Sequence, residues 1–584
     1  MNHIQGIDRF QITFSSLDEQ IDKENPVRII DAFIDKLDLN LLGFVTKPPK
    51  TEENQQPKHS NPSDGRPSFE LKCLLKLYFY GYFNGIRSSR RLEKECSRNI
   101  ELRWLLGALT PNYHTIADFR KHNPKALKNC FKLYTLFLQD IGLIAGKTLA
   151  VDGSKFRASN SKKNNYSQNK IDRQLDYIEQ KTTEYLRQLD QADSIELSQD
   201  SIQLIQQKLL YFQTSKINYQ LLQDQLTQSG QTQISTTDPD AKALLVQGQV
   251  VEVSYNLQAA VDDKHNLVVA THVINRNDRN ALHDIAREAK EGLNSEGFTV
   301  LADKGYHNGR EIQNCHTDQI QTIVAPSETV NSNKHGTTED YLVTKFTYHP
   351  QTDSYTCPAE KTLTTTGTWH KKTRERDSHL FKKYRTPDCK TCPVKQHCTG
   401  RKDGGREIER SEFAHAVEAN LKKLQENAPL YKRRQMIIEH IFGTLKRKWG
   451  FGFTDLRGLE KVNGEFALIM TVYNFKRTIT LIGIKELTEK IKSWKPDYKK
   501  VPLDSKSLLK AQITNYLAYF GISTTAVKLN MVLNRVQFSN RLNHLYSSEM
   551  GFFGKSNNFF TVCRCRQFSK EGMYHNAPPI GRIN

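Results

Sequence analysis

The sequence has little cysteine, fewer acidic than basic residues, and no long apolar run. Its 10 cysteines among 584 residues are too dilute for a disulfide scaffold. No run approaches the roughly 18 apolar residues of a membrane span. The opening MNHIQGIDRFQITF lacks a signal-peptide pattern. These absences exclude a disulfide-stapled secreted domain and an integral membrane protein, and we expect a cytoplasmic protein of several domains.

The excess of basic residues indicates a polyanionic partner. The chain has 84 Lys and Arg against 64 Asp and Glu, a net charge of +20 and a pI near 9.3. Because no amphipathic membrane anchor is evident, nucleic acid is the first candidate partner. A basic soluble protein without a special partner is the alternative.

The N-terminal part reads as helical. A weak helical pattern in residues 1–50 is followed by a polar, proline-containing linker at 51–67 and a further helical stretch at 68–140. Cations crowd one connecting stretch of this last segment: Arg87, Arg90, Arg91, Lys94 and Arg98. We expect a small helical DNA-binding domain, and a helical bundle with a solvated basic face is the open alternative.

Two acids follow short apolar strands. Asp152 ends the strand LAV within GKTLAVDGSKFRAS and is followed by Lys155 and Arg157, and Asp303 ends the strand in FTVLADKGY. An acid at a strand end beside cations suits a metal that meets phosphate. Each acid alone could equally be an ordinary turn residue.

The element order predicts a mixed-sheet α/β domain carrying two insertions. Strand and helix patterns in residues 141–162, 229–326 and 427–485 form a three-layer unit. Residues 163–228 read as two heptad-like helices joined near Ser194, an antiparallel hairpin with a spacer or interaction role. Residues 327–426 form the second insertion.

A basic helix over residues 431–451 carries one acid among many cations. Pro429 stands at its expected start and Gly450 at its expected end. Glu439 and Lys446 are seven residues apart, so on a regular helix they lie within about 20° of each other. A carboxylate beside an ammonium suits a metal next to a phosphodiester. A solvated basic helix with one acid is the alternative.

The second insertion contains a cysteine cluster: Cys357, Cys389, Cys392 and Cys398. One C-x2-C pair with two further cysteines could make a four-thiolate Zn²⁺ site, because thiolates favour tetrahedral zinc. His370 and His397 are spare candidate ligands. Reduced thiols without a metal are the alternative.

Together these motifs resemble the DDE transposases of bacterial insertion sequences, specifically the family numbered 1182. The resemblance covers roughly residues 10–480 and rests on quoted stretches of the sequence: GRPSFELKCLLKLYFYGYFNGIRSSRRLEKECS, AVDGSKFRA, TDPDA with YNLQAAVD, LADKGY, the cysteine insertion and EHIFGTLKRKWGF. It implies a ribonuclease H-like catalytic domain that cuts and rejoins the element's ends with Mg²⁺, or with Mn²⁺ as a substitute. It also implies double-stranded DNA partners, namely terminal inverted repeats and target DNA, a dimer assembled on DNA ends, and a place at the bacterial nucleoid.

The resemblance also implies roles for individual residues. Asp152, Asp303 and Glu439 would be the metal ligands, and Lys446 would hold a phosphate. Two further DNA contacts, Tyr431 and Arg434, sit one residue early relative to the family's pattern, which places its arginine where Gln435 stands. The remaining candidate DNA contacts are Lys155, Arg157, Arg90 and Arg91.

Two other functions remain open at this point. One is a metal-dependent DNA nuclease of the same fold without strand transfer, and the other is an inactive DNA-binding relic. The C-terminal extension, residues 495–584, is patterned poorly and indicates no function.

Overall fold

A computed structural model gives the structure of the chain. It describes residues 10–12, 14–45, 68–192, 199–246, 250–326, 337–374, 377–401 and 404–501. The chain divides into two units, Met1–Ala511 and Gln512–Asn584, and all described residues belong to the first. The predicted linker at 51–67 and nearly all of the predicted C-terminal extension therefore lie outside the described residues.

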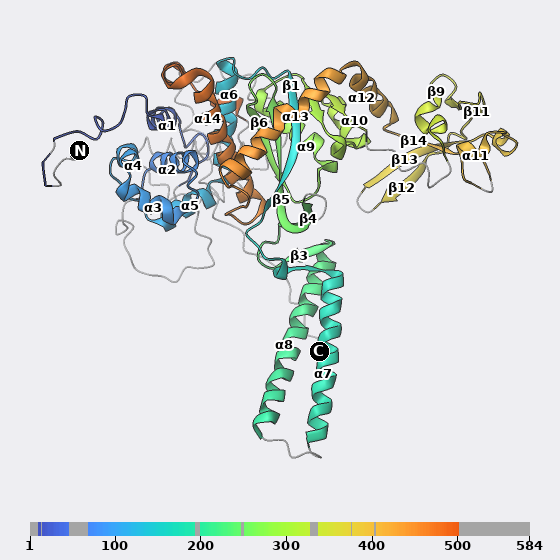
Figure 1. Cartoon of the computed structure of the whole chain (residues 1–584), viewed down its shortest axis with the longest axis horizontal. Helices are drawn as coiled ribbons and strands as arrows, with labels where there is room; N and C mark the ends of the chain where they lie inside the picture. The colour runs from blue at the N-terminus through green and yellow to red at the C-terminus, as the bar shows by residue number, and fades with distance from the viewer. Residues whose placement is uncertain are drawn as a thin grey trace, which may run out of the picture. The chain divides into compact units, whose positions relative to one another are not determined.

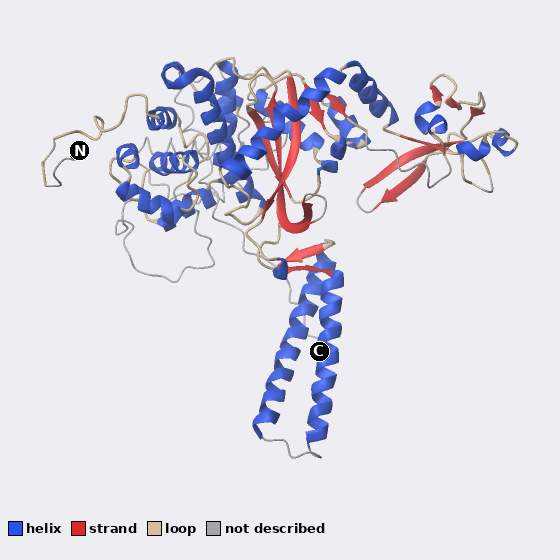
Figure 2. Ribbon diagram, in the orientation of Figure 1, coloured by secondary structure: helices blue, strands red, loops and turns tan. Residues whose placement is uncertain are grey.

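The described chain before residue 148 is built from helices without strands (Figures 1 and 2). Asparagine side chains start several of them, because Asn25, Asn99 and Asn112 each accept a backbone N–H from the first turn. The helices are α1 (Pro26–Asp35), α2 (Leu71–Phe83), α3 (Ser89–Arg98), α4 (Ile100–Leu105), α5 (Tyr113–His122) and α6 (Pro124–Asp140). The predicted helical character of this segment is confirmed.

A mixed sheet of six strands forms the centre of the described chain. The strands are β1 (Thr148–Arg157), β4 (Lys242–Val246), β5 (Val250–Asp262), β6 (Val268–Ile274), β7 (Thr299–Ala302) and β8 (Gln321–Val324). Their order is β4–β5–β1–β7–β8, with β6 also paired to β5. β1, β7 and β8 run parallel, whereas β5 is antiparallel to β1, β4 and β6. The predicted mixed α/β class is confirmed.

Helices cover this sheet and its edges. α9 packs on β5 and β6, α10 and α12 pack on β8, α13 crosses β1, β5 and β7, and α14 packs on β6 and α6. Their bounds are α9 (Leu282–Leu293), α10 (Gly309–Thr317), α12 (Ala414–Glu426), α13 (Ala428–Gly443) and α14 (Leu459–Ser493). A π-helical segment, η9 (Thr444–Lys448), continues α13.

Two buried asparagines pair with the outer strands of the sheet. Asn474 of α14 accepts the Val268 N–H at 2.8 Å and donates to the Val268 carbonyl at 2.7 Å, on β6. Asn420 of α12 makes the same two bonds to Val324 of β8, at 2.9 and 2.8 Å. Both amides thus satisfy backbone groups on strands that pair on one side only.

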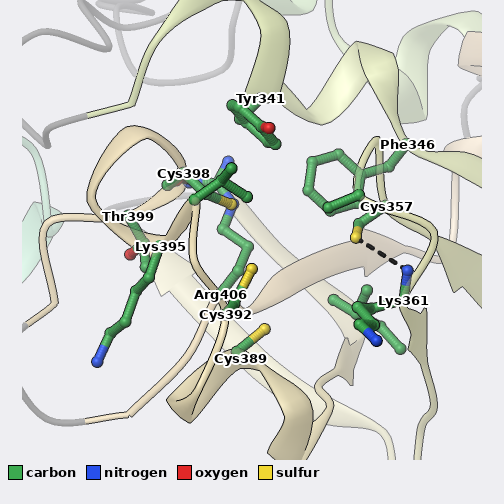
Figure 3. Close-up of a pocket in the computed structure, with 13 residues that line it drawn as sticks. Tyr341, Phe346, Cys357, Lys361, Cys389, Cys392, Lys395, Cys398, Thr399 and Arg406 are labelled. Atoms are coloured by element: carbon green, nitrogen blue, oxygen red, sulfur yellow. Dashed lines mark hydrogen bonds between the residues drawn. The ribbon is translucent and has the colours of Figure 1, made fainter.

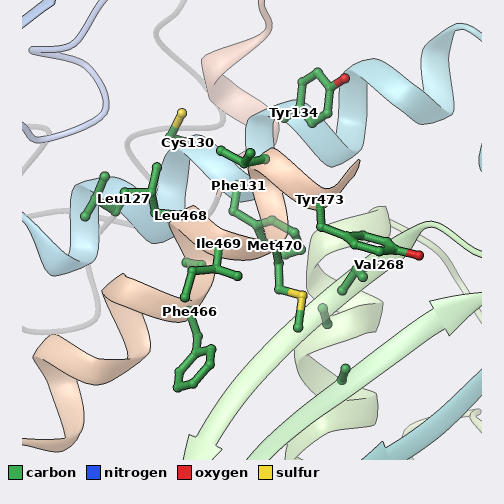
Figure 4. Close-up of a cluster of buried hydrophobic side chains, with 14 of the residues drawn as sticks. Leu127, Cys130, Phe131, Tyr134, Val268, Phe466, Leu468, Ile469, Met470 and Tyr473 are labelled. Atoms are coloured by element: carbon green, nitrogen blue, oxygen red, sulfur yellow. The ribbon is translucent and has the colours of Figure 1, made fainter. Parts of the chain in front are cut away.

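The core is continuous from the N-terminal helices to the sheet. Figure 4 shows Phe131 of α6 beside Met470 of α14, and Tyr473 of α14 next to Val268 of β6. At one end α14 comes so near α6 that a Cβ on Gly464 would lie 2.4 Å from the Pro124 Cα. The helices of the segment 68–140 therefore share one hydrophobic core with the sheet.

The two segments read as insertions contain their own small elements. A pair of long helices, α7 (Gln168–Ala192) and α8 (Gln199–Ser229), pack on each other beside the β-ribbon β2 (Asn165–Ser167) and β3 (Gln233–Ser235). Their expected junction at Ser194 lies outside the described residues. Further on come β9 (Thr347–His349), β10 (Ser354–Thr356), β11 (Thr362–Leu363), β12 (His370–Arg374), β13 (Asp377–Tyr384), α11 (Lys395–Cys398) and β14 (Ile408–Ser411).

Short 3-10 helices complete the secondary structure: η2 (Lys162–Asn164), η3 (Asp278–Asn280), η4 (Lys304–Tyr306), η6 (Glu339–Tyr341), η7 (Val343–Lys345), η8 (Pro387–Lys390) and η10 (Tyr498–Lys500). No helix in the described part of the chain is long and apolar enough to cross a membrane.

A buried cluster of four charges, called here the ion cluster, joins the N-terminal helices to α14. Arg87 contacts Glu465 at 2.7 Å and Asp455 at 3.2 Å, and Arg120 lies 3.4 Å from Asp455 and 3.6 Å from Glu465. Glu465 is fully buried and also accepts the Asp455 and Leu456 backbone N–H groups. Although burial opposes its charge, Arg120 and Arg87 hold the pKa of Glu465 below its ordinary value.

We expect Glu465→Gln to lower the free energy of unfolding by about 3 to 5 kcal/mol, because it leaves two buried guanidinium groups with one carboxylate. The matched control is Glu486→Gln on the same helix, whose carboxylate makes an exposed pair with Lys490 and should change stability by less than about 1 kcal/mol. Urea unfolding of both variants measures the difference. Equal urea midpoints would show that the ion cluster does not hold these segments together.

Candidate active site

Two carboxylates stand side by side on neighbouring parallel strands. Asp152 lies on β1, and Asp303 directly follows β7. The prediction that Asp152 ends its strand is wrong, because β1 continues to Arg157 in its pairing with β5. The register pairs Ala150 with Leu301, so the two acids, each two residues further along, lie at the same level. The buried residues Leu149, Ala150 and Val151 fix β1 in the core, and the strand therefore delivers Asp152 to a defined place.

Burial sets the charge state of Asp152. Loss of solvent, with a further contribution from the nearby charges of Asp303 and Asp278, raises the pKa of Asp152 to about 6. The Gly153 backbone N–H, 2.8 Å from Oδ1, and the Arg434 guanidinium act in the opposite direction. The protein therefore holds a carboxylate whose negative charge is only partly compensated, which is a position that a cation would stabilise.

A polar layer lies beside Gly153. Oδ1 of Asp278 accepts hydrogen bonds from Asn256 Nδ2 at 2.7 Å and from Gln258 Nε2 at 2.8 Å, and both donors belong to β5. Its other oxygen lies 3.3 Å from the Lys155 ammonium of β1. A Cβ on Gly153 would lie 2.2 Å from Gln258 Nε2 and 2.4 Å from Asp278 Oδ1. Only glycine therefore lets this layer approach β1 directly after Asp152.

The turn after β7 connects Asp303 to the same layer. Asp303 accepts the Gly305 N–H at 2.9 Å and so starts the short helix η4. Tyr306, the last residue of η4, is fully buried, and its hydroxyl donates to Gln258. Desolvation, followed by the charges of Asp278, Asp152 and Asp303, raises the pKa of Tyr306 well above its ordinary value. The hydroxyl is therefore a fixed, neutral donor.

The helix α13 brings two of the predicted residues to this edge of the sheet. Tyr431 is partly buried beside Arg434, Asp303 and the backbone of Ala325. Desolvation raises the pKa of Tyr431, whereas Arg434 acts against this rise. Arg434 also acts on Asp152. The Arg434 guanidinium thus acts on both Tyr431 and Asp152.

Glu439, the third predicted acid, is exposed on α13 and accepts Nε2 of Gln435 at 2.6 Å. Among the described residues, no three His, Cys, Asp or Glu side chains lie close enough together to hold a metal ion. Asp152 and Asp303 thus lie level on neighbouring strands, but in this conformation they do not form a three-carboxylate group with Glu439.

Lys446 does not share a helix face with Glu439 as predicted, because the helix changes from α to π after Gly443. It lies in η9, where the i→i+5 pattern rotates side chains relative to α13. Its ammonium donates to the Lys155 carbonyl at 2.7 Å and lies 4.7 Å from the Phe156 ring. Burial, assisted by the charge of Lys155, lowers the pKa of Lys446 to about 8. Lys446 therefore faces β1, while Glu439 faces solvent.

The other predicted DNA contacts are divided between surface and interior. Arg157, Arg90 and Arg91 are exposed, and Arg90 lies over the Tyr113 ring at 4.7 Å. Lys155 is partly buried in its ion pair with Asp278. Arg87, counted among the cations of the connecting stretch, is instead buried in the ion cluster.

Asp278, Gln258 and Tyr306 are site residues that sequence reasoning missed. In the sequence, Asp278 directly precedes an amphipathic helical pattern and Gln258 lies within a strand pattern, so neither residue stands out. The available signal was alternation along β5: Asn256 and Gln258 are polar, two residues apart and fully buried. Such a pair inside an apolar strand indicates an internal hydrogen-bond network.

Comparisons with known protein families give two matches. Residues 356–479 match the family described as a transposase DDE domain, and residues 15–122 match the transposase domain family DUF772. The first range contains Tyr431, Arg434 and Glu439, whereas Asp152 and Asp303 lie outside both ranges. No curated protein and no solved structure matches the chain.

We expect Asp152→Asn to stabilise the metal-free protein at pH 8. The folded state raises the pKa of Asp152 from 3.8 to about 6, so its ionised form costs stability above pH 6, whereas below about pH 4 the cost is absent. The gain should reach roughly 3 kcal/mol at pH 8 and vanish at pH 4. Urea unfolding with chelator measures it, and Asp140→Asn is the exposed control. A variant less stable than wild type at pH 8 would show that the attraction of Arg434 for the ionised Asp152 carboxylate exceeds the cost of burying it.

Proposed function

We propose that this chain, which belongs to the DDE transposases of insertion sequences, binds the ends of its element and catalyses DNA strand cleavage and strand transfer. The observation that carries the proposal is the pair Asp152 and Asp303, held level on parallel strands. The family numbered 1182, already indicated by the motifs, is part of the proposal. So are assembly as a dimer on DNA ends and action in the bacterial cytoplasm, at the nucleoid.

A ribonuclease H-like catalytic domain is the proposed fold. The strand order β6–β5–β1–β7–β8, antiparallel on one side of β1 and parallel on the other, supports it. Along the chain, β1 is the first and β7 the fourth of these five strands, and in the sheet the two lie next to each other. Asp152 on β1 and Asp303 directly after β7 are therefore neighbours although they are 151 positions apart in the sequence (152 and 303).

The residues present fit a divalent cation, and we propose Mg²⁺, with Mn²⁺ as a substitute. Asp152 and Asp303 would hold it, because hard cations prefer carboxylate oxygens and the charge of Asp152 is opposed by burial and by Asp303. When bound, such ions activate the attacking oxygen and stabilise the leaving oxygen of a phosphodiester. Glu439 is the proposed third ligand, recruited from its exposed position on α13.

The chain's own side chains position the strands and the substrate. Arg434 lies near Asp152 and Tyr431, where it can also contact a phosphate. The layer of Asp278, Gln258 and Tyr306 fixes β1 and the turn after β7. Lys446 holds η9 to β1 through the Lys155 carbonyl, so its proposed action on DNA is through the placement of that strand.

We expect Asp152→Asn, Asp303→Asn and Glu439→Gln each to abolish Mg²⁺-dependent cleavage while leaving DNA binding intact, because each removes a proposed ligand without removing a basic contact. The assay uses DNA carrying the terminal inverted repeats, with Mg²⁺ and with chelator. Glu426→Gln, an exposed change at the end of the neighbouring helix α12, is the matched control. Added Mg²⁺ should also raise the melting temperature of wild type more than that of the Asp152 and Asp303 variants.

The reaction products separate the proposal from its alternatives. Rejoined DNA supports a transposase, cuts without rejoining indicate a nuclease, and binding with neither indicates a relic. Wild-type cleavage by any one variant would remove that residue from the site. Loss of activity in the control variant as well would show that the assay reports folding.

The exposed arginines of α3 give an independent prediction about DNA binding. Replacing Arg90 and Arg91 together by Ala should weaken binding similarly for all DNA sequences and reduce the slope of log affinity against log salt by about 2. Arg287→Ala, an exposed arginine of α9, is the control. Binding titrations at several salt concentrations measure the slope. An unchanged slope would mean that this helix does not contact phosphates.

A further inference from the structure

Four cysteines from separate segments face one pocket. Cys357 follows β10, Cys389 lies in η8, Cys392 follows it, and Cys398 ends α11. All four line the same pocket, together with Tyr341, Phe346 and Arg406. Figure 3 shows their sulfur atoms directed toward the space between these segments. The fold thus gathers thiols that are up to 41 positions apart (357 and 398) in the sequence.

Backbone groups already donate to two of these sulfur atoms. The Lys361 N–H lies 3.3 Å from Cys357 Sγ, within a turn closed by the Cys357 N–H donating to the Lys361 carbonyl at 2.9 Å. The Arg406 N–H donates to Cys389. These N–H groups orient the two sulfur atoms, as outer-shell donors do around metal ligands.

The region around the four cysteines, within the insertion 327–426, has only a small hydrophobic core. Its own cluster has only five buried members among the described residues: Phe346, Tyr355, Leu363, Tyr384 and Ile408. Cys357 and Cys398 pack against this cluster. A region of this size with so small a core ordinarily needs a disulfide or a metal to stay folded. All four cysteines are free thiols in the structure.

We propose that Cys357, Cys389, Cys392 and Cys398 bind one structural Zn²⁺ ion that fastens these segments together. A C-x2-C pair with two further thiolates around one pocket matches the tetrahedral coordination that zinc prefers. The described thiols are not yet at ligand spacing, so the side chains close on the ion as it binds, and each releases its proton to solvent. His370 and His397 do not line the pocket and take no part.

The first test is the metal content of the full-length protein purified without chelator. We expect one zinc per chain by elemental analysis, released when a mercurial reagent modifies the thiols. The variant Cys389→Ser with Cys392→Ser should lose the zinc, because two ligands rarely hold it. The matched control, Cys130→Ala with Cys315→Ala, also removes two cysteines, both buried elsewhere in the core, and should keep the zinc.

A second measurement keeps the proposal testable if the serine variant does not fold. Wild-type protein in which Co²⁺ replaces the zinc should show the strong thiolate-to-cobalt absorption of a tetrahedral four-sulfur site. The proposal is overturned by metal-free protein whose four thiols stay reactive after zinc is added. It is equally overturned by two disulfides in the mass spectrum, or by zinc retained in the serine variant.

Discussion

The carboxylate of Asp152 is the interaction on which the candidate site depends. β1 is paired with β5 through Asp152 and with β7 up to Ala150, and burial at this position raises the pKa of Asp152 to about 6. The parallel register of β7 then adds a second carboxylate, Asp303, at the same level. Arg434 is the one positive charge that acts on Asp152 most directly. Removing the Asp152 charge would raise the stability of the metal-free protein. A cation-binding site, in contrast, requires such a charge.

Contacts elsewhere in the fold keep the buried Asp152 and the neighbouring Asp303 in place. The layer beside Gly153 locks β1 to β5 through Asp278, and Tyr306 ties the turn after β7 to the same layer. α14 pairs with β6 through Asn474 and reaches the N-terminal helices through the ion cluster. The helices of residues 68–140, expected as a separate DNA-binding domain, therefore share core and charges with the sheet.

The sequence predicts what depends on local patterns and misses what depends on partners. Apolar runs before Asp152 and Asp303 identified both strands, and the helix start at Pro429 was read correctly. Arg87 looked like Arg90 because sequence spacing does not reveal that Glu465, 378 positions away, neutralises it. Nothing local in the sequence singles out Asp278, because its partners Asn256 and Gln258 lie on β5. Lys446 was placed on the face of Glu439 because regular periodicity cannot anticipate the π-helical turn in η9.

The geometry of α13 limits how Glu439 can reach Asp152 and Asp303. Ile437, Ile438 and Ile441 are buried against the sheet, and exposing each would cost about 1.5 to 3 kcal/mol. Turning the whole helix would therefore cost several kcal/mol. Changing the Glu439 side-chain conformation breaks one exposed hydrogen bond from Gln435, worth roughly 0.5 to 1.5 kcal/mol. A side-chain movement of Glu439 therefore costs less, and it leaves Tyr431 and Arg434 in place near Asp303 and Asp152. In that case Asp152 and Asp303 are already in place on the sheet, and only the Glu439 side chain of α13 would move when metal and DNA bind.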